Sequence, residues 1–270
     1  MSLATKYPKI SIVTPSYNQG AYLEQTIRSV LDQNYANLEY IIVDGGSTDN
    51  SVEIIKRYEQ GLAFWSSERD KGQSDAINRG FARTTGHIMG WLNSDDMLAP
   101  GALQSLAEAY QSGIRWYHGN HSGLMADGSL LVGSGDFFGR WTHNDLLFEG
   151  AVIAQVATFW NREIWDAAGA FVLDHDLIMD YDLWLRFSRL TPSTPIFPVL
   201  GVFREHSLAK TGTEIGRAKY NAAKQERRKQ EIIAMLKSQW SSGRPWEILT
   251  TAFKVLSAFK RAIFRKAQAL

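Results

Sequence analysis

Short apolar segments alternate with segments of helical periodicity over the first 92 residues. The apolar segments cover residues 10–13, 40–43, 63–65 and 88–92, and between them apolar residues recur every three or four positions. These segments lack the polar and apolar alternation of a strand with one face in water, so we expect strands that are buried on both faces. The sequence therefore predicts an α/β fold with a mostly parallel, Rossmann-like sheet covered by helices.

The composition suits one large globular domain, or a domain followed by a tail. The chain has 270 residues, and 44% of them are hydrophobic, which is enough for a proper core. It contains no cysteine, which excludes a disulfide framework, a zinc ribbon and a thiol nucleophile. Because the chain starts with a polar segment and has no long apolar window, we expect a cytoplasmic protein without a signal peptide or a transmembrane helix.

Hydroxyl and carboxylate side chains gather in the segments that follow the predicted strands. Because parallel strands end at one edge of the sheet, these segments should converge on one crevice, where an aromatic ring, hydroxyls and carboxylates suit the base and ribose of a nucleotide. Two residues have an ordinary alternative role, since Asp44 suits a turn before Gly45 and Tyr17 suits the core. The candidates are Thr14, Tyr17, Asp44, Ser47, Asp70, Asp75 and Asp95.

Two adjacent carboxylates, Asp95 and Asp96, follow the strand predicted at residues 88–92. Neighbouring carboxylates repel each other unless a cation lies between them or one takes a proton, and such oxygen ligands suit Mg²⁺ or Mn²⁺. The chain has no G-x-x-x-x-G-K-[ST] loop, and no G-x-G-x-x-G follows the first strand, so we expect a metal here to neutralise bound phosphates. The ordinary alternative is a solvated turn and helix N-cap that starts at Asn93.

Four segments, in this order, resemble the nucleotide-sugar half of family 2 glycosyltransferases: residues 14–18 (TPSYN), 43–49 (VDGGSTD), 70–80 (DKGQSDAINRG) and 91–96 (WLNSDD). The resemblance implies an A-type glycosyltransferase fold. It also implies that Asp44 contacts the nucleotide base, that Asp95 lies near the ribose or the metal, and that Asp96 binds Mn²⁺ or Mg²⁺ directly. The donor-site residues that we expect are Thr14, Pro15, Tyr17, Asp44, Ser47, Asp70, Asp75, Asn93, Asp95 and Lys210.

A second acidic segment, residues 179–182 (MDYD), begins a predicted helix with a buried apolar face. The resemblance implies that Asp180 is the catalytic base, although Met179 replaces the glutamate that the family usually has beside it. The ordinary alternative is a capping role, because the helix dipole stabilises carboxylates at the N-terminal end. We expect Asp182 to be structural.

Residues 204–211 (REHSLAKT) resemble the histidine-bearing segment of the family. The resemblance implies that His206 approaches the metal and the diphosphate. A neutral imidazole binds a metal, whereas a protonated imidazole donates to phosphate, and Lys210 would supply a point charge. The alternative for His206 is an exposed histidine in a loop.

The charge of the chain changes near residue 216. Residues 216–270 carry 13 Lys and Arg against 3 Asp and Glu, a net of 13 − 3 = +10, and the overall +1 leaves −9 for residues 1–215. We therefore expect a glycosyltransferase catalytic domain at 1–215, with a nucleotide-sugar half at 1–100 and an acceptor half at 101–215. A basic amphipathic helical tail then occupies residues 216–270.

Within this tail we expect a long charged helix over residues 217–239, a break, and a second helix with a broad apolar face over 246–270. The second helix suits an anionic membrane surface, and it equally suits packing on its own domain or on a partner in a homodimer. We expect no nucleic-acid partner, because the basic residues accompany a broad apolar face.

These patterns and the resemblance together predict an inverting, metal-dependent glycosyltransferase. It would move one sugar from a nucleoside diphosphate sugar, most readily a UDP sugar, to a hydroxyl of a saccharide or lipid-linked acceptor in cell-surface polysaccharide synthesis. A peripheral position at the inner face of the membrane would follow from the tail. The alternatives are a non-catalytic scaffold that binds nucleotide or sugar and, less favoured, a sugar nucleotidylyltransferase, which would need a basic Gly-rich loop after the first strand.

Overall fold

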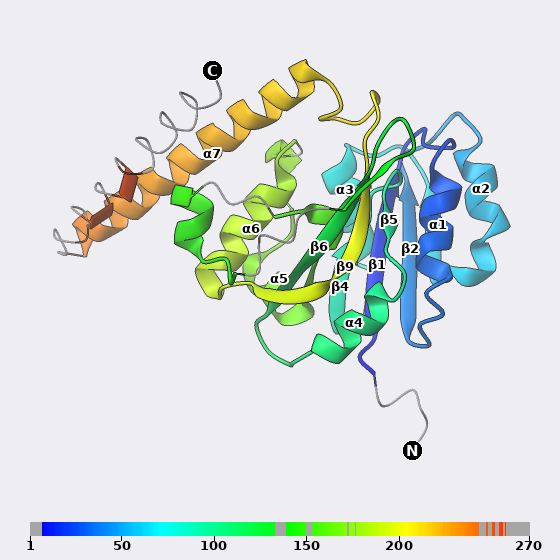
Figure 1. Cartoon of the computed structure of the whole chain (residues 1–270), viewed down its shortest axis with the longest axis horizontal. Coiled ribbons are helices and arrows are strands. Elements are labelled where there is room, and N and C mark those ends of the chain that lie inside the picture. Colours follow the sequence, from blue (N-terminus) through cyan, green and yellow to red (C-terminus); the bar gives the residue numbers. More distant parts are fainter. Residues whose placement is uncertain are drawn as a thin grey trace.

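A computed structural model describes residues 7–132, 139–149, 153–171, 173–175 and 177–242, together with some residues between 247 and 257. In this part of the chain a central sheet lies between two layers of helices, as Figure 1 shows. The predicted α/β fold is confirmed. A long C-terminal helix, α7, extends from the sheet on the side opposite α1 and α2.

The first half of the chain builds four parallel strands in the order β3-β2-β1-β4, as the apolar segments predicted. All seven residues of β1 are buried, because β1 pairs with β2 on one side and β4 on the other. The loops after these strands therefore open at one edge of the sheet. The elements are β1 (Ile10–Ser16), α1 (Leu23–Leu31), β2 (Leu38–Asp44), α2 (Ser51–Arg57), β3 (Phe64–Ser67), α3 (Gln73–Phe81) and β4 (Ile88–Trp91).

The second half extends the same sheet with strands of mixed direction, in the order β8-β6-β9-β5 beyond β4. Strand β8 runs antiparallel to both β4 and β6, whereas β6 and β9 are parallel. The turn at Asp127 and Gly128 joins β6 to β7 as a hairpin. The elements are β5 (Met97–Leu98), α4 (Ala102–Ala109), β6 (Trp116–Leu124), β7 (Leu130–Val132), β8 (Thr158–Asn161), α5 (Arg162–Ala168), α6 (Met179–Leu190) and β9 (Thr194–Arg204), with short helical turns at Glu59–Gly61, Asp145–Glu149, Gln155–Ala157 and Leu173–His175.

Successive side chains of the strands point to opposite faces and form two separate cores. On one face, Ile10 and Ile12 of β1 pack with α1, α2 and α4. On the other face, Val13 of β1 packs with α3, α5 and α6. Each helix contributes one apolar stripe, such as Leu23 and Ile27 of α1, so the sheet needs a helix layer on both sides.

Tryptophan rings dominate the core beneath α6. Trp91 of β4 and Trp116 of β6 both stack on Trp184 of α6, with ring centroids 5.8 Å and 5.6 Å from it. Trp160 of β8 meets Trp91 and Trp184 edge to face. All four rings are at most 2% exposed. This packing fixes the start of α6 relative to the carboxyl end of β4, where the two acidic segments lie.

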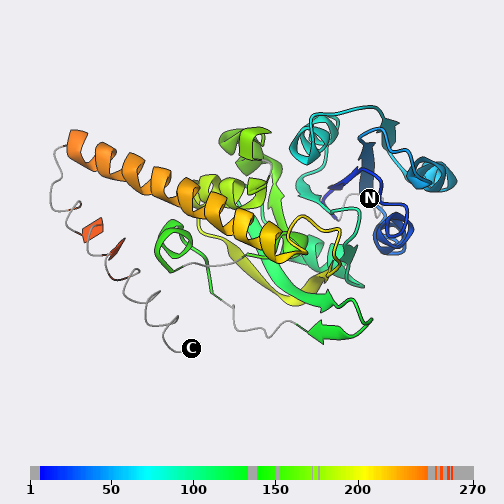
Figure 2. The same ribbon diagram turned by 90° about the horizontal axis from the view of Figure 1, so that it is seen from above.

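The long charged helix predicted at residues 217–239 is α7 (Glu214–Ser241). Its N-cap is Thr213, whose side chain accepts a hydrogen bond from the Gly216 amide. Figure 2 shows α7 running along α6, and Ile232 and Met235 pack against the core beneath α6. The helix is thus bound to the rest of the fold along one side.

The second helix of the predicted tail lies largely outside the described residues, and so do its apolar positions Trp246, Phe253 and Phe264. Two residues of it are described in contact with the body of the protein. Val255 packs against the core beneath α6, and Thr251 hydrogen-bonds with Gln239 of α7. Among the helices that the structure describes, none combines the length and the apolar character needed to cross a bilayer.

Candidate active site

A cavity of about 780 Å³ opens at the edge of the sheet where the parallel strands end. The loops after β1, β2, β3 and β4 form most of its wall, and the end of β9 with the segment that follows closes it. Its position is the one predicted from the convergence of the loops. The lining residues are Pro15, Ser16, Tyr17, Gln19, Gly45, Gly46, Arg69, Asp70, Gly72, Gln73, Ala76, Asn93, Ser94, Asp95, Asp96, Phe203, Leu208, Ala209, Lys210 and Thr211.

Most of the expected donor-site residues lie in this wall. Tyr17 is 61% exposed at the mouth, which leaves its ring free to cover a planar group and rules out a core position. Asp70 accepts a hydrogen bond from the Gly72 amide at 2.9 Å, which shapes the loop before α3. The expected residues that the cavity brings together are Pro15, Tyr17, Asp70, Asn93, Asp95, Asp96 and Lys210.

Four expected donor-site residues do not line the cavity. The Thr14 hydroxyl is buried against the Tyr40 hydroxyl, 3.0 Å away. Asp75 accepts a hydrogen bond from the Lys71 amide at the start of α3. Asp44 and Ser47 are engaged with each other in the loop after β2.

The Asp44 carboxylate holds that loop in shape. It is fully buried and accepts hydrogen bonds from the amides of Gly46 and Ser47, at 3.1 Å and 2.8 Å, and from the Ser67 hydroxyl at 2.7 Å. Gly46 has a φ of +82°, which favours glycine, and a side chain on Gly45 would come within 2.8 Å of an Asp70 oxygen. In this structure Asp44 therefore acts behind the wall of the cavity, as a turn-forming residue would.

Asn93 connects the cavity floor to the core. Its Oδ1 accepts hydrogen bonds from Gln73 Nε2 at 2.7 Å and from Trp91 Nε1 at 3.1 Å. Its Nδ2 donates to Gln155 Oε1 at 3.1 Å and to Asp96 Oδ2 at 3.2 Å. The amide thus fixes the orientation of Asp96 relative to α3 and β4.

Asp95 and Asp96 form a tightly held pair of carboxylates. Asp96 is only 2% exposed, and its Oδ1 accepts a hydrogen bond from the Arg204 amide at 2.9 Å. Burial first, and then the charge of Asp95, raise the pKa of Asp96 to about 8. The guanidinium of Arg204 also donates to the Asp95 carbonyl at 3.0 Å. Arg204, the last residue of β9, therefore contacts both Asp95 and Asp96.

His206 reaches the same pair from the segment after β9. Its Nε2 lies 3.0 Å from Asp95 Oδ2, and its ring packs on the Tyr22 ring with centroids 4.5 Å apart. The side chain is 9% exposed, so His206 is not the exposed loop histidine of the alternative interpretation. Among the described residues, its buried Nδ1 has no hydrogen-bond partner.

These residues fit a divalent cation that is shared with a substrate. Carboxylate and imidazole donors suit Mn²⁺, and the raised pKa of Asp96 reflects a buried acidic pair that a nearby cation would relieve. Within the part of the chain that the structure describes, no group of three or more His, Asp or Glu side chains is arranged to hold a metal by itself. An ion at Asp95 and Asp96 would therefore complete its coordination with phosphate oxygens and water.

The wall also contains residues that the analysis of the sequence missed, among them Ser16, Arg69 and Gln73. The Ser16 hydroxyl is buried without a hydrogen-bond partner in the described part of the chain, which suits contact with a bound polar ligand. Arg69 adds a cation next to Asp70. Ser16 and Gln73 stand inside two of the motifs quoted above, so their positions were available from the sequence.

Asp180 lies in the first turn of α6 and outside the wall of the cavity. Its Oδ1 accepts a hydrogen bond from the Tyr181 amide at 2.7 Å. Burial raises the pKa of Asp180, although the charge of Lys224 on α7 acts in the opposite direction. The neighbouring Met179 places its Sδ 3.2 Å from the hydroxyl of Ser74 on α3. The start of α6 is therefore in contact with the helix that carries Gln73 of the cavity wall.

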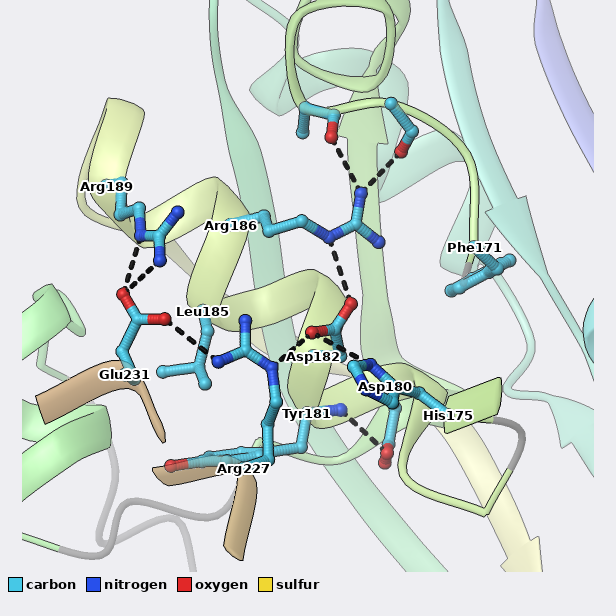
Figure 3. A network of polar contacts seen from close by, with 12 residues as sticks. Phe171, His175, Asp180, Tyr181, Asp182, Leu185, Arg186, Arg189, Arg227 and Glu231 are labelled. Carbon is cyan, nitrogen blue, oxygen red and sulfur yellow. Dashed lines mark hydrogen bonds and ion pairs between the residues drawn. The ribbon is translucent and has the colours of Figure 1, made fainter. Parts of the chain in front are cut away.

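Asp182, in contrast, points into the protein. It is 2% exposed and pairs with Arg186 at 3.0 Å and with Arg227 of α7 at 2.6 Å, as Figure 3 shows. His175 Nδ1 lies 3.3 Å from it. These contacts agree with the structural role expected for Asp182.

Comparison with known proteins gives consistent results. Residues 11–117 match the family described as glycosyl transferase family 2. An uncharacterized glycosyltransferase of Mycobacterium tuberculosis is 30% identical over 204 residues, which covers 74% of this chain and 76% of that protein. A chondroitin synthase of Escherichia coli is 25% identical over 191 residues, which covers 69% of this chain and 27% of the synthase.

Two solved structures have the same fold. The mannosyltransferase PcManGT from Pyrobaculum calidifontis, solved with GDP-Man and Mn²⁺, aligns over 98% of this chain and 81% of that chain, with a TM-score of 0.63 and 16% identity. The S. aureus protein TarS, residues 1–349, solved with UDP, aligns over 74% of this chain and 61% of that chain, with a TM-score of 0.57 and 15% identity. The chain thus spans less than two thirds of TarS 1–349 and about a quarter of the chondroitin synthase.

The likeness to solved structures establishes the glycosyltransferase A-type fold, and the mycobacterial relative extends the family match across three quarters of the chain. The cavity at the strand ends and the Asn93 to Asp96 motif agree with this assignment. The chain belongs to glycosyl transferase family 2.

Proposed function

We propose that the protein transfers one sugar, with inversion, from a nucleoside diphosphate sugar to a hydroxyl group of an acceptor. One observation carries the proposal. The cavity at the strand ends places a polar wall next to the Asp95 and Asp96 pair, and Met179 connects this wall through Ser74 to the helix turn that carries Asp180. A donor site and a candidate base are thus held on adjoining elements.

The donor would bind in the cavity with its nucleotide over the loops after β1 and β2. Tyr17 would cover the base, Ser16 would donate its hydroxyl to the ligand, and Arg69 and Lys210 would contact the diphosphate. Relatives bind UDP in one case and GDP-Man in another, and we propose a UDP sugar for this chain. The expected contact of Asp44 with the base stays a proposal, and it requires the carboxylate, which lies behind the wall in this structure, to turn into the cavity. The expected role of Asp75 in the donor site stays a proposal as well.

Asp95, Asp96 and His206 would hold Mn²⁺ or Mg²⁺ together with the diphosphate. The ion, when bound, supplies positive charge to the departing diphosphate. The residues do the positioning: Arg204 and Asn93 hold Asp96, and Tyr22 orients the His206 ring against Asp95. The PcManGT structure contains Mn²⁺, which supports a metal here.

Asp180 would accept the proton of the acceptor hydroxyl as that oxygen attacks the anomeric carbon from the face opposite the diphosphate. Burial at the N-terminus of α6 raises the pKa of Asp180, which strengthens it as a base. A single displacement of this kind inverts the configuration at the anomeric carbon. Two carboxylates, Asp180 and Asp182, lie in the first turn of α6, because Met179 replaces the usual glutamate. Asp182 is paired with Arg186 and Arg227, so Asp180 is the carboxylate of this turn that no arginine engages.

The acceptor would be a saccharide or a lipid-linked saccharide, in the synthesis of cell-surface polysaccharide or lipopolysaccharide. Similarity to a chondroitin synthase supports a saccharide acceptor. The net charge of +10 over residues 216–270 supports a peripheral position at the cytoplasmic face of a membrane, where basic residues meet anionic headgroups. Packing of Val255 on the core and pairing of Thr251 with Gln239 support the alternative, a tail that packs on its own domain.

Calorimetric titration of UDP, GDP and dTDP, each with and without Mn²⁺, tests the donor site. We expect metal-dependent binding of UDP that Asp96→Asn removes. Asp32→Asn is the matched control, because Asp32 is an exposed carboxylate at the end of α1 and its loss should leave binding unchanged. Binding of no nucleotide by the wild-type protein would contradict the proposal.

Asp180→Asn tests the base. The variant should bind UDP and Mn²⁺ as the wild type does, and it should lose donor hydrolysis and transfer. Nucleotide binding by the wild type without hydrolysis of any nucleotide sugar, and without transfer to any acceptor, would instead favour the non-catalytic scaffold.

A further inference from the structure

Helix α7 presents one stripe of polar side chains to α6. Tyr220, Lys224, Arg227 and Glu231 are spaced four, three and four residues apart, so they lie on one face of the helix. All four side chains are at least partly buried, whereas most other positions of α7 are exposed, so this face of the helix is the one that packs on the fold. The stripe ends at Glu231, which is 3% exposed and pairs with Arg189 of α6.

A buried ion network fixes the register of α7 against α6. Arg227 donates to Asp182 at 2.6 Å and to Glu231 at 2.9 Å, and Arg189 of α6 donates to Glu231 from Nε at 2.7 Å. Figure 3 shows the contacts that join Arg189, Glu231, Arg227 and Asp182 as dashed lines. Because both carboxylates are almost fully buried, a shift of α7 by one turn would leave unpaired charges in the interior.

This register places Lys224 over Tyr181, the residue that directly follows the candidate base. Lys224 lies one turn before Arg227, and its Nζ lies 4.7 Å from the centre of the Tyr181 ring, which directly follows Asp180. Lys224 is close enough for its charge to lower the pKa of Asp180, and the charge of Asp180 in turn raises the pKa of Lys224 against the effect of burial. Tyr220 is the other titratable side chain of α7 beside Asp180, and burial, then the charge of Asp180, raise its pKa.

The other titratable and charged groups around this turn are placed differently. On α6, Tyr181 points its hydroxyl to the Leu146 carbonyl, and Asp182 is paired with Arg186 and Arg227. His175 faces Asp182. Arg228 of α7 acts on Tyr181 and Lys224. Lys224 is therefore the cation of the described residues that acts on Asp180.

We propose that Lys224 is a positioning residue of the transferase reaction, which α7 holds over Tyr181 next to the candidate base so that the Asp180 carboxylate stays ionised for its role. The inference rests on the proposed function of Asp180. It assigns α7 to the reacting site, although the sequence places this helix in a tail. The network of Arg227, Asp182 and Glu231 would serve to hold Lys224 in place.

Carbon-13 NMR titration of the Asp carboxyl groups tests the contact directly. The Asp180 signal is the one absent from the Asp180→Asn spectrum. In Lys224→Gln the loss of the nearby cation should move the midpoint of this signal to higher pH. Lys224→Arg keeps the charge and should leave the midpoint near that of the wild type. Lys229→Gln removes the same charge from the exposed side of α7, where Lys229 faces Glu226, and should have no effect.

Donor hydrolysis with UDP-glucose and Mn²⁺, or with the sugar of whichever nucleotide binds, supplies the second measurement. In Lys224→Gln, kcat/KM should fall roughly threefold to tenfold on the acidic side of the pH profile and recover at alkaline pH, where Asp180 is ionised in both proteins. Lys224→Met keeps the packing over Tyr181 and replaces Lys224→Gln if thermal melting shows that the latter is unfolded.

An unchanged Asp180 midpoint in Lys224→Gln and Lys224→Met overturns the inference. A higher KM with an unchanged pH profile also overturns it, because Lys224 would then bind substrate and would not act through Asp180. Retention of full hydrolysis by Asp180→Asn, in contrast, refutes the proposed base itself. If Asp180→Asn loses hydrolysis while the Asp180 midpoint stays unchanged in the Lys224 variants, only the role of Lys224 is refuted. The proposed function then stays intact.

Discussion

Glu231 of α7 should contribute stability that disappears in acid, and Glu231→Gln measures it. Burial acts to raise the pKa of Glu231, but hydrogen bonds from His143, Arg189 and Arg227 outweigh burial and lower the pKa from 4.5 to about 2. The side chain is only 4% exposed, so little of this effect is screened by solvent. A difference of about 2.5 pH units corresponds to about 3 kcal/mol of stability.

The sign follows from the lowered pKa. The unfolded chain binds a proton at Glu231 near pH 4.5, whereas the folded chain does so only near pH 2, so the contribution is complete above pH 4.5 and is lost between pH 4.5 and 2. At pH 7, Glu231→Gln should lower the free energy of unfolding by about 3 kcal/mol. At pH 3 about 60% of the difference from the wild type should be gone.

Urea unfolding followed by circular dichroism, at pH 7 and at several values down to pH 3, gives both numbers. Glu226→Gln is the control on the same helix, because Glu226 is exposed and lies 3.8 Å from the exposed Lys229. That variant should lose less than about 1 kcal/mol at any pH. A loss in Glu231→Gln that is the same at pH 7 and pH 3 would refute the reasoning, since the stability would then come from packing and not from the ionised carboxylate.

Three other substitutions should give distinct results. Asp96→Asn should raise the melting temperature at pH 7 in the absence of metal. The unfolded chain ionises Asp96 near pH 3.8 and the folded chain only near pH 8, so this group costs stability increasingly as the pH rises through that range. A lower melting temperature of the variant at pH 7 would contradict this. Gly46→Ala should cost about 1 kcal/mol in urea unfolding, because φ at this position is +82° and the side chain would be strained; an unchanged stability would show that the loop rearranges freely. Gly80→Ala should cost about 1–3 kcal/mol by the same measurement, because its Cβ would lie 2.4 Å from Val13 Cγ1 in the core; a neutral effect would mean that α3 can move away from β1.

The first half of the fold was predictable because its signals are local. Each strand from β1 to β4 is a continuous apolar segment, and each is followed by turn residues, so the parallel sheet and the position of the cavity follow from general rules. The second half mixes strand directions. The antiparallel insertion of β8 between β4 and β6 depends on pairing between distant segments, which periodicity does not contain.

Many residues of the site were predictable from the sequence, whereas their contacts with one another were not. Asp95 and His206 are 111 residues apart and meet only because β9 brings its end to the carboxyl end of β4. Thr14 and Asp44 were expected after their strands, yet they lie within the last three residues of β1 and β2, and their side chains contact Tyr40 and Ser67 in the interior. The network around Arg227 was invisible, because a charged residue on a charged helix has the same pattern whether it faces water or a buried carboxylate.

The hydrogen bond from Trp91 to Asn93 couples the fluorescence of a buried tryptophan to the donor cavity. Trp91 Nε1 donates to the same amide oxygen that binds Gln73, and Asn93 in turn holds Asp96. Any ligand that moves Asn93 therefore changes the polarity around a buried indole. Trp91 stacks on Trp184 and meets Trp160 edge to face, with both ring centroids within 6 Å of its own, so a change around Trp91 also affects neighbouring indoles. The intrinsic fluorescence of the unlabelled protein should thus follow occupancy of the donor cavity in real time.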